Sequence, residues 1–240
     1  MVNLQDEIKR NIDRVRENIE LAATRSGRSA GEICLMGVTK FQPLDAIYAA
    51  LSCGLSFFGE NRVQERDEKK SKWDGPDATW HMIGHLQRNK ARRALELFDC
   101  IQSVDNFELA SALERIIATN EDGERHLSPY PIMAEVNVSG EESKQGVSPE
   151  KCFALIEDIA VKCPHIEIKG LMTIGPISSD ERMIGESFAT LRGIRDDARG
   201  RFGLALPHLS MGMSGDYAIA IEEGSTIVRI GGALFGARDR

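Results

Sequence analysis

Residues 33–43, ICLMGVTKFQP, lead from an apolar segment straight into a threonine and a lysine. Ile33–Val38 reads as a strand that is covered on both faces, as the strands of parallel sheets are. A doubly wound open sheet would favour a glycine-rich turn directly after its first strand, whereas Val38-Thr39-Lys40-Phe41 contains no glycine. This stretch therefore favours a closed barrel over an open sheet.

Short apolar runs alternate with longer amphipathic stretches along the chain. The runs that read as strands are Ile33–Val38, Leu55–Phe58, Thr79–Ile83, Cys100–Val104, Ile132–Val138, Ile166–Met172, His208–Met211 and Thr226–Ile230. The helical stretches are Leu4–Ala23, before the first strand, and then Leu44–Leu51, Arg62–Lys72, Arg88–Phe98, Phe107–Thr119, Pro149–Cys163, Met183–Arg199 and Tyr217–Glu222. Strands that alternate with helices form βα units, and eight units close a barrel. The sequence predicts an α/β fold: a single (β/α)8 barrel of the TIM type with an additional N-terminal helix, in which residues 1–240 form one domain.

The composition is typical of a globular protein, with 42% hydrophobic and 28% charged residues. The formal net charge of −7 argues against binding to nucleic acid or to anionic membranes. No apolar run approaches the ~20 residues of a membrane-spanning helix, and the first residues lack the features of a secretory signal. We therefore expect a cytoplasmic monomer that binds neither membranes nor nucleic acid.

The cysteines and histidines offer no metal-binding pattern. The five cysteines are odd in number and include no CxxC pair, so we expect free thiols rather than disulfides or a zinc site. His81 and His85 are four residues apart but lie outside an H-E-x-x-H frame. His81 falls on an expected strand, where it either lines a pocket or is a hydrogen-bonded core histidine.

Lys40 is the first candidate for chemistry. In barrel enzymes the chemistry lies in the loops at the carboxyl ends of the strands, and Lys40 follows the first strand directly. Partial desolvation there would lower the pKa of its amine, and a neutral amine can attack an aldehyde to form an imine. The simpler alternative is a solvated lysine in an ordinary loop.

The loops after the seventh and eighth strands are the usual place for a phosphate site in such barrels. Met213, Ser214 and Gly215 can present backbone N–H groups, and Ser214 adds a hydroxyl. Gly231 and Gly232 let the backbone approach an anion closely. The alternative is that the glycines form tight turns and that Ser214 is an N-cap.

Arg229 lies on the eighth strand, immediately before those glycines. A guanidinium ion inside a barrel needs a partner, because an unpaired buried charge is costly. That partner is either a structural carboxylate or the ring nitrogen of a bound heterocycle. The loop from Glu141 to Gly146 is expected to be exposed, as a surface loop or a lid.

Five segments, in this order, resemble the pyridoxal phosphate homeostasis protein family along essentially the whole chain. They are Val38-Thr39-Lys40, Phe58-Gly59-Glu60-Asn61, Trp80-His81-Met82-Ile83-Gly84-His85-Leu86-Gln87, Ser210-Met211-Gly212-Met213-Ser214 with Asp216, and Val228-Arg229-Ile230-Gly231. The resemblance implies a barrel like the N-terminal domain of alanine racemase. It also implies that the protein binds pyridoxal 5′-phosphate (PLP) as a Schiff base on Lys40.

The resemblance assigns roles to further residues of this chain. Arg229 would face the pyridine nitrogen, and Asn61 and His81 would lie near the ring. The residues implied to hold the phosphate are Met213, Ser214, Gly231 and Gly232. The chain departs from the family at two positions: Gly232 stands where a hydroxyl residue is frequent, and Arg62 where an aromatic residue is frequent. Both departures bear on affinity and on details of the pocket.

The role that this resemblance implies is to bind, buffer or deliver PLP, with PLP-dependent apo-enzymes as partners. A racemase-like PLP enzyme is the second interpretation. An arginine at the pyridine nitrogen weakens the ring as an electron sink, which a racemase tolerates. The three tyrosines lie outside the matching segments, and we expect no second domain to supply an opposite-face base. A third interpretation is a Schiff-base aldolase without a cofactor.

Overall fold

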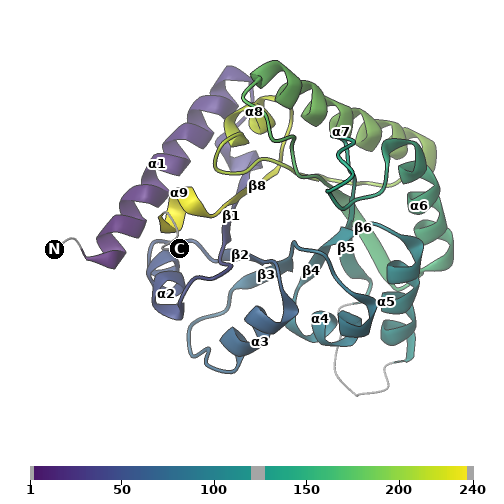
Figure 1. The fold of residues 1–240 in the computed structure, drawn as a ribbon, viewed down its shortest axis with the longest axis horizontal. Helices are drawn as coiled ribbons and strands as arrows, with labels where there is room; N and C mark the ends of the chain where they lie inside the picture. Colours follow the sequence, from purple (N-terminus) through teal and green to yellow (C-terminus); the bar gives the residue numbers. More distant parts are fainter. Residues whose placement is uncertain (1–2, 120–127, 237–240) are drawn as a thin grey trace.

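Eight parallel strands form a closed barrel in the order β1 to β8. The computed structural model describes residues 3–119 and 128–236. Figure 1 looks down the barrel and shows the helices as an outer ring. The strands are β1 Cys34–Val38, β2 Phe57–Glu60, β3 Thr79–Met82, β4 Cys100–Val104, β5 Tyr130–Glu135, β6 Ile166–Met172, β7 His208–Ser210 and β8 Ile227–Ile230. The predicted (β/α)8 barrel is confirmed.

The helices follow the strands as the alternating pattern predicts, after a first helix that precedes β1. They are α1 Leu4–Arg25, α2 Leu44–Ser52, α3 Val63–Lys70, α4 Ala91–Leu97, α5 Phe107–Thr119, α6 Pro149–Lys162, α7 Glu181–Phe202, α8 Tyr217–Glu222 and α9 Gly232–Phe235, with short 3-10 turns η1 Ala30–Glu32 and η2 Arg88–Lys90. The helix α7 is longer than predicted, because Asp180 caps its start and Gly203, at φ 67°, ends it.

The fifth strand differs from its prediction in both bounds. The apolar run Ile132–Val138 suggested a strand through residue 138, but β5 ends at Glu135. Val136 instead pairs with Val147 in an isolated bridge, and the Val147 N–H donates to the Glu135 carbonyl oxygen. The chain therefore turns back on itself at the barrel mouth.

Apolar side chains pack on both sides of the barrel wall, because successive residues of a strand point to opposite faces. The larger group lies between the strands and the helices, and it includes Phe58, Ile101 and Phe188. A smaller group fills the interior: Met36, Ile83, Cys100, Met133, Met172 and Ile227. All five cysteines are free thiols.

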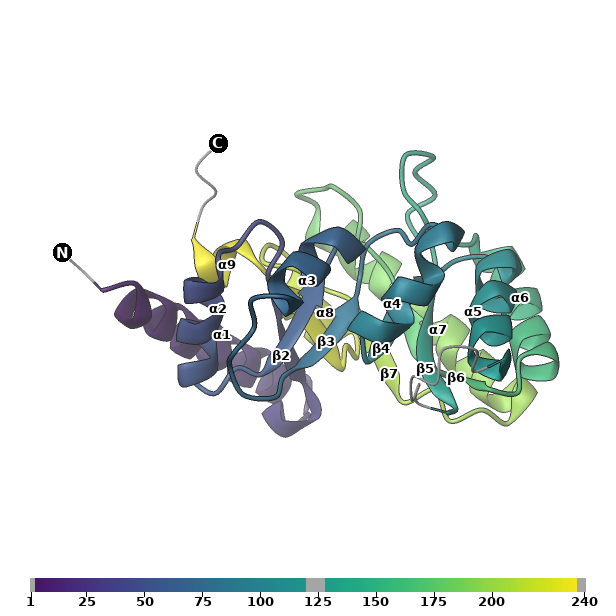
Figure 2. The same cartoon turned by 90° about the horizontal axis from the view of Figure 1, so that it is seen from below.

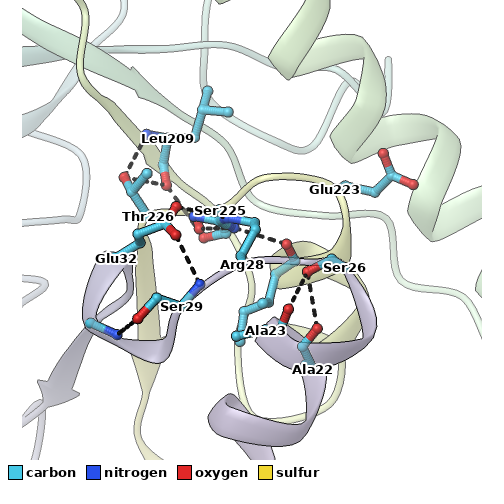
Figure 3. Close-up of polar contacts among 12 residues, drawn as sticks. Ala22, Ala23, Ser26, Arg28, Ser29, Glu32, Leu209, Glu223, Ser225 and Thr226 are labelled. Atoms are coloured by element: carbon cyan, nitrogen blue, oxygen red, sulfur yellow. Dashed lines mark hydrogen bonds and ion pairs between the residues drawn. The ribbon is translucent and has the colours of Figure 1, made fainter.

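The N-terminal helix α1 joins the beginning of the chain to its end. It packs against α2, α8 and α9, and Figure 2 shows it along one side of the barrel. The segment after it is held by Arg28, whose Nη1 donates to the carbonyl oxygens of Ile221 at 2.9 Å and Ser225 at 2.8 Å. Figure 3 shows this contact beside the capping box of Ser29 and Glu32. These bonds help to close the barrel between its first and last βα units.

In the described ranges, no helix is long and apolar enough to cross a membrane. The same residues contain no group of three or more histidine, cysteine, aspartate or glutamate side chains that could hold a metal ion.

Candidate functional site

A cavity of about 280 Å³ lies at the carboxyl ends of the strands, and we call it the upper pocket. Seven of the eight site residues expected from the sequence line it: Lys40, Asn61, Met213, Ser214, Arg229, Gly231 and Gly232. They come from the loops after β1, β2 and β7 and from β8 with its loop. Closure of the barrel brings together segments that are up to 192 residues apart in the chain, from Lys40 to Gly232.

The residue before Lys40 is held on both its backbone and its side chain. The N–H of Thr39 donates to the Gly59 carbonyl oxygen at 3.0 Å, and its hydroxyl donates to Glu60 Oε1 at 2.6 Å. Lys69 Nζ, on α3, donates to the Thr39 carbonyl oxygen at 2.7 Å and also pairs with the Glu60 carboxylate. This network orients the segment that carries Lys40.

Glu60 is fully buried at the end of β2. Burial raises the pKa of its carboxyl group, whereas Lys69 and then Thr39 act to lower it. Its Oε2 atom has no hydrogen-bond partner among the described residues. The Glu60–Lys69 pair was not predicted from the sequence, where the available signal was a glutamate at the end of an apolar run.

Arg229 is 4% exposed and makes three hydrogen bonds to oxygen atoms. Its Nη1 donates to the Ser210 carbonyl oxygen at 2.6 Å and to Ser210 Oγ at 2.8 Å, and its Nη2 donates to the Thr173 carbonyl oxygen at 2.7 Å. These partners hold the guanidinium group against two neighbouring strands. Because a guanidinium group has five N–H donors, Nε–H and one Nη2–H form no bond within the described part of the chain.

The structural carboxylate that the sequence suggested as a partner of Arg229 acts only at longer range. Burial lowers the pKa of Arg229 to about 10, and Glu135 and Asp216 act in the opposite direction. Burial likewise raises the pKa of Glu135, at the end of β5, to about 7. The mouth of the barrel thus holds one buried cation near a buried acid, Glu135, and a partly buried one, Asp216, with no direct ion pair to Arg229 among the described residues.

The loop after β7 is held by Asp216. Its Oδ1 accepts the Met213 N–H at 2.6 Å, and the Met213 carbonyl oxygen accepts the N–H groups of Asp216 and Tyr217. The Met213 N–H is therefore engaged within its own loop, contrary to the expectation that it is presented to a phosphate. Ser214 Oγ faces the eighth loop instead, where it accepts the Ala233 N–H at 3.3 Å.

The glycines of the eighth loop leave room in the pocket. A Cβ atom on Gly231 would lie 3.5 Å from Val38, an ordinary contact, and one on Gly232 would meet nothing within 4 Å. A side chain would therefore fit at both Gly231 and Gly232 without a steric clash. Gly84 is different, because its Cβ would lie 2.3 Å from the Asn61 carbonyl oxygen, so this glycine lets the loop that carries Asn61 pack closely.

His81 is the one expected site residue that the structure does not bring to the upper pocket. It points into the barrel from β3 but lies nearer the amino ends of the strands, where it lines a different cavity with Phe57 and Cys100. Its Nδ1 accepts from Gln102 Nε2 at 2.7 Å. Of the two roles left open by the sequence, the hydrogen-bonded interior histidine describes it, with part of the ring exposed to that cavity.

Two other sequence features lie outside the pocket lining. Arg62 is beside the exposed ring of Phe41, with 5.7 Å between its guanidinium carbon and the ring centre. Lys144, in the loop expected to be exposed, is largely covered: its Nζ bonds to Glu141 Oε1 at 2.6 Å and to the Gly175 carbonyl oxygen at 2.8 Å.

The three tyrosines all have structural partners. Tyr48 donates to Asp74, Tyr130 donates to the Phe98 carbonyl oxygen, and Tyr217 accepts from Asn18. None of the three lines the upper pocket.

Comparison with known proteins gives consistent matches. The family described as alanine racemase, N-terminal domain, matches residues 10–239. A pyridoxal phosphate homeostasis protein of Aquifex aeolicus is 41% identical over 229 residues, which cover 95% of this chain and 96% of that protein. A structure of PipY from Synechococcus elongatus with PLP bound is 36% identical, with a TM-score of 0.78 over 92% of this chain and 100% of that chain. An alanine racemase of Corynebacterium glutamicum is 17% identical, with a TM-score of 0.73 over 98% of this chain and 62% of that chain, and this likeness shows the fold alone.

Proposed function

We propose that this chain, which belongs to the pyridoxal phosphate homeostasis protein family, binds PLP in the upper pocket and buffers or delivers it within the cell. The observation that carries the proposal is the arrangement of Lys40, Arg229 and Ser214 around one pocket. An amine, a fixed cationic donor and a small-residue loop are the groups that an aldehyde, a pyridine nitrogen and a phosphate require. Bound PLP in the relative PipY supports it.

Arg229 is suited to a pyridine nitrogen because it retains N–H donors after binding Ser210 and Thr173. A guanidinium group donates and does not accept, so it meets the ring nitrogen in its unprotonated form. Such a ring withdraws electrons weakly. This suits a cofactor that is held rather than used.

The phosphate is proposed to lie between the Met213–Gly215 loop and Gly231-Gly232. The open space at Gly232 and the hydroxyl of Ser214 offer room and a donor there. The N–H groups of Ser214 and Gly215 take the place that Met213 cannot fill, because its N–H is bound to Asp216. Asn61 is proposed to lie at the ring, and its buried Oδ1 has no partner among the described residues.

Lys40 is proposed to hold PLP as a Schiff base. Its Nζ forms a C=N bond with the aldehyde carbon, and the aldehyde oxygen leaves as water. The contribution of the protein is positional: Glu60 and Lys69 hold Thr39, the residue before Lys40, in place. Reduction with borohydride would make the link permanent, which provides the test.

Purified protein incubated with PLP should develop a visible absorption band that borohydride abolishes. Peptide mass mapping of the reduced protein should place the pyridoxyl group on Lys40. Lys40→Ala should lose the band and retain its fold, while Lys90→Ala, a change in the 3-10 turn η2, should behave as the unaltered protein. A major adduct on any other lysine would contradict the assignment.

The proposed role is non-enzymatic, with PLP-dependent apo-enzymes as recipients. Racemisation needs a second proton donor opposite Lys40, and the tyrosines are bound elsewhere. PLP-loaded protein should therefore reactivate an apo-enzyme, whereas a chiral assay over the common amino acids should detect no turnover. Sustained turnover that Lys40→Ala abolishes would favour the racemase-like alternative. A protein that develops no visible chromophore with PLP would favour the aldolase.

A further inference from the structure

The barrel has a second and larger cavity at the amino ends of its strands, which we call the floor cavity. Its volume is about 860 Å³, within the range of small-molecule sites. It lies at the opposite end from Lys40, and the proposed PLP site uses none of it. Residues at this end of a barrel ordinarily serve stability, and the proposed PLP site does not account for a hollow of this size.

The inner wall of the floor cavity is apolar. It is formed by Met133 and Ile227, which belong to the small interior group of side chains, and by Phe57, which packs against that group. Phe57 also packs edge-on against the His81 ring, with the ring centres 4.7 Å apart and the planes at 81°. A flat apolar group would be buried favourably against this surface.

A chain of hydrogen bonds sets the proton on His81. Arg229 Nη1 donates to Ser210 Oγ, and Ser210 Oγ donates to Gln102 Oε1 at 2.6 Å. The amide nitrogen of Gln102 is then directed at His81 Nδ1, 2.7 Å away. An amide nitrogen only donates, so Nδ1 accepts and the neutral ring carries its hydrogen on Nε2. His81 therefore offers the floor cavity a fixed N–H donor.

The basic groups of the cavity lie close enough to oppose one another's charge. Burial lowers the pKa of His81 to about 3, and the His208 charge contributes. Burial also lowers the pKa of His208, and the Lys169 charge adds to this effect. Both imidazoles are therefore uncharged at neutral pH, and Lys169, which pairs with Glu167 Oε1 at 2.6 Å, is the cation beside them.

The other charged groups that line the cavity are occupied or offset. Asp99 accepts the Trp80 N–H at 2.7 Å. Arg16, on α1, donates to the Cys53 and Gly54 carbonyl oxygens, and Glu20 lies one turn further along the same helix. The His81 N–H group and the Lys169 ammonium group are therefore the donors that would select the polar end of a ligand.

We propose that the floor cavity binds a small carboxylate with a flat apolar body. One carboxylate oxygen accepts from His81 Nε2–H on the side of His208 and Lys169, and the apolar body lies against Phe57, Met133 and Ile227. Both Ser210 and Gln102 keep His81 in the required tautomer. The site is independent of PLP, because its ligand touches neither Lys40 nor the phosphate loops.

Benzoate is the probe that tests this proposal. Protein with 15N-labelled histidine rings is titrated with sodium benzoate and followed by long-range 1H–15N correlation spectra. Before addition, His81 should show hydrogen on Nε2. Benzoate should shift the His81 and His208 ring nitrogens saturably, while His165, on the outside of the barrel and bonded to Glu114, should stay unchanged. The Lys40→Ala protein should give the same titration, which separates this site from the proposed PLP site.

Three comparisons make the result decisive. Benzyl alcohol lacks the carboxylate and inorganic phosphate lacks the apolar body, so each should bind at least tenfold more weakly than benzoate. The variant His81→Phe should weaken benzoate binding by at least tenfold. Equal shifts with benzyl alcohol, or no saturable shift at any soluble benzoate concentration, would overturn the proposal.

A second measurement needs no variant. Cys34 lines the floor cavity and is exposed, whereas Cys53 lies outside its lining. Bound benzoate should slow alkylation of Cys34 by iodoacetamide and leave the rate at Cys53 unchanged. Equal rates at Cys34 with and without saturating benzoate would also overturn the proposal.

Discussion

The carboxyl end and the amino end of this barrel treat buried polar groups in different ways. At the carboxyl end Arg229 is a cation held by oxygen atoms of Ser210 and Thr173, and Glu60 is paired with Lys69. At the amino end burial keeps His81 neutral, and its hydrogen bond within the described ranges is to an uncharged amide, that of Gln102. The same eight strands therefore support buried charges at the mouth and a neutral buried imidazole towards the floor, joined through Gln102.

The difference has a physical origin in the available partners. Strand ends expose backbone oxygens and receive side chains from the loops, so a charge there can be surrounded by dipoles. Further down the barrel each backbone group is already used in the sheet. Only side chains of neighbouring strands remain as partners, and neutral hydrogen bonds cost less to bury there. The following predictions test this contrast, in order of decreasing effect.

Breaking the Glu60–Lys69 pair should have the largest effect on stability. In Lys69→Met, Glu60 is left buried without its cation, and we expect a loss of about 3–5 kcal/mol in the free energy of unfolding. Urea unfolding measures it. Lys70→Met is the matched control: in the part of the chain that the structure describes, the Lys70 amine makes an exposed bond to the Glu96 carbonyl oxygen, and its loss should cost less than about 0.5 kcal/mol. Similar losses of unfolding free energy in both variants would mean that the Glu60–Lys69 pair does not stabilise the carboxyl end of the barrel.

The acid at the mouth should make the protein less stable as the pH rises. The pKa of Glu135 is raised in the folded protein from 4.5 to about 7, so between these values the folded state holds the proton more tightly. Its contribution is complete below pH 4.5 and is lost as the pH rises through 7, a change of about 3 kcal/mol. Glu135→Gln should remove this slope, as measured by unfolding at a series of pH values. An unchanged slope would show that Glu135 ionises as it does in the unfolded chain.

The His81 imidazole should have the opposite effect and make the protein less stable as the pH falls. The pKa of His81 is lowered from 6.5 to about 3, so the unfolded chain binds the proton more tightly. This stability is complete above pH 6.5 and is lost as the pH falls toward 3. Because the ring is partly exposed, we expect roughly 2 kcal/mol of the loss to come from this residue. His81→Gln retains an acceptor for Gln102 but cannot titrate, so its stability should change less with pH between 6.5 and 4. Parallel pH profiles for the two proteins would remove the contrast between the ends.

Removing Gln102, which connects the two ends of the barrel, should reduce the free energy of unfolding by less. In Gln102→Leu the Ser210 hydroxyl loses its acceptor but keeps the Arg229 donor, and His81 Nδ1 loses its donor; an unsatisfied buried group costs about 1–3 kcal/mol. The variant should also release the His81 proton from Nε2, so that both tautomers appear in the 15N spectrum. Thr119→Leu, an exposed change at the end of α5, is the control for substitution by leucine. A retained single tautomer would show that Gln102 does not set it.

The smallest predicted effect is a gain in PLP affinity from the substitution Gly232→Ser. A serine there finds open space and adds a hydroxyl next to the proposed phosphate position. One extra hydrogen bond of about 1 kcal/mol should tighten PLP binding by about fivefold. Gly232→Ala supplies the Cβ without the hydroxyl and should bind PLP as the unaltered protein does. Equal affinities of the serine and alanine variants would place the phosphate elsewhere.

Much of the fold could be read from local sequence. The strand runs and helical stripes are periodic patterns over a few residues, and their alternation predicts the barrel without knowledge of any contact. The positions of Lys40, Asn61, Ser214 and Gly231 at strand ends follow from the same reading, because the carboxyl ends of parallel strands meet at one mouth.

Other features depended on the tertiary structure. An inward residue on a strand faces either the mouth or the floor of the barrel, depending on its distance from the strand end and on the tilt of the closed barrel. For this reason His81 lines the floor cavity, although it was expected near the PLP ring. The partners of Arg229, the pair of Glu60 with Lys69 and the engagement of the Met213 N–H by Asp216 were likewise visible only in the fold. The sequence by itself therefore determined the barrel and the end that carries Lys40, since both follow from local periodicity. Only closure of the barrel decided which polar groups meet, because their partners come from distant strands.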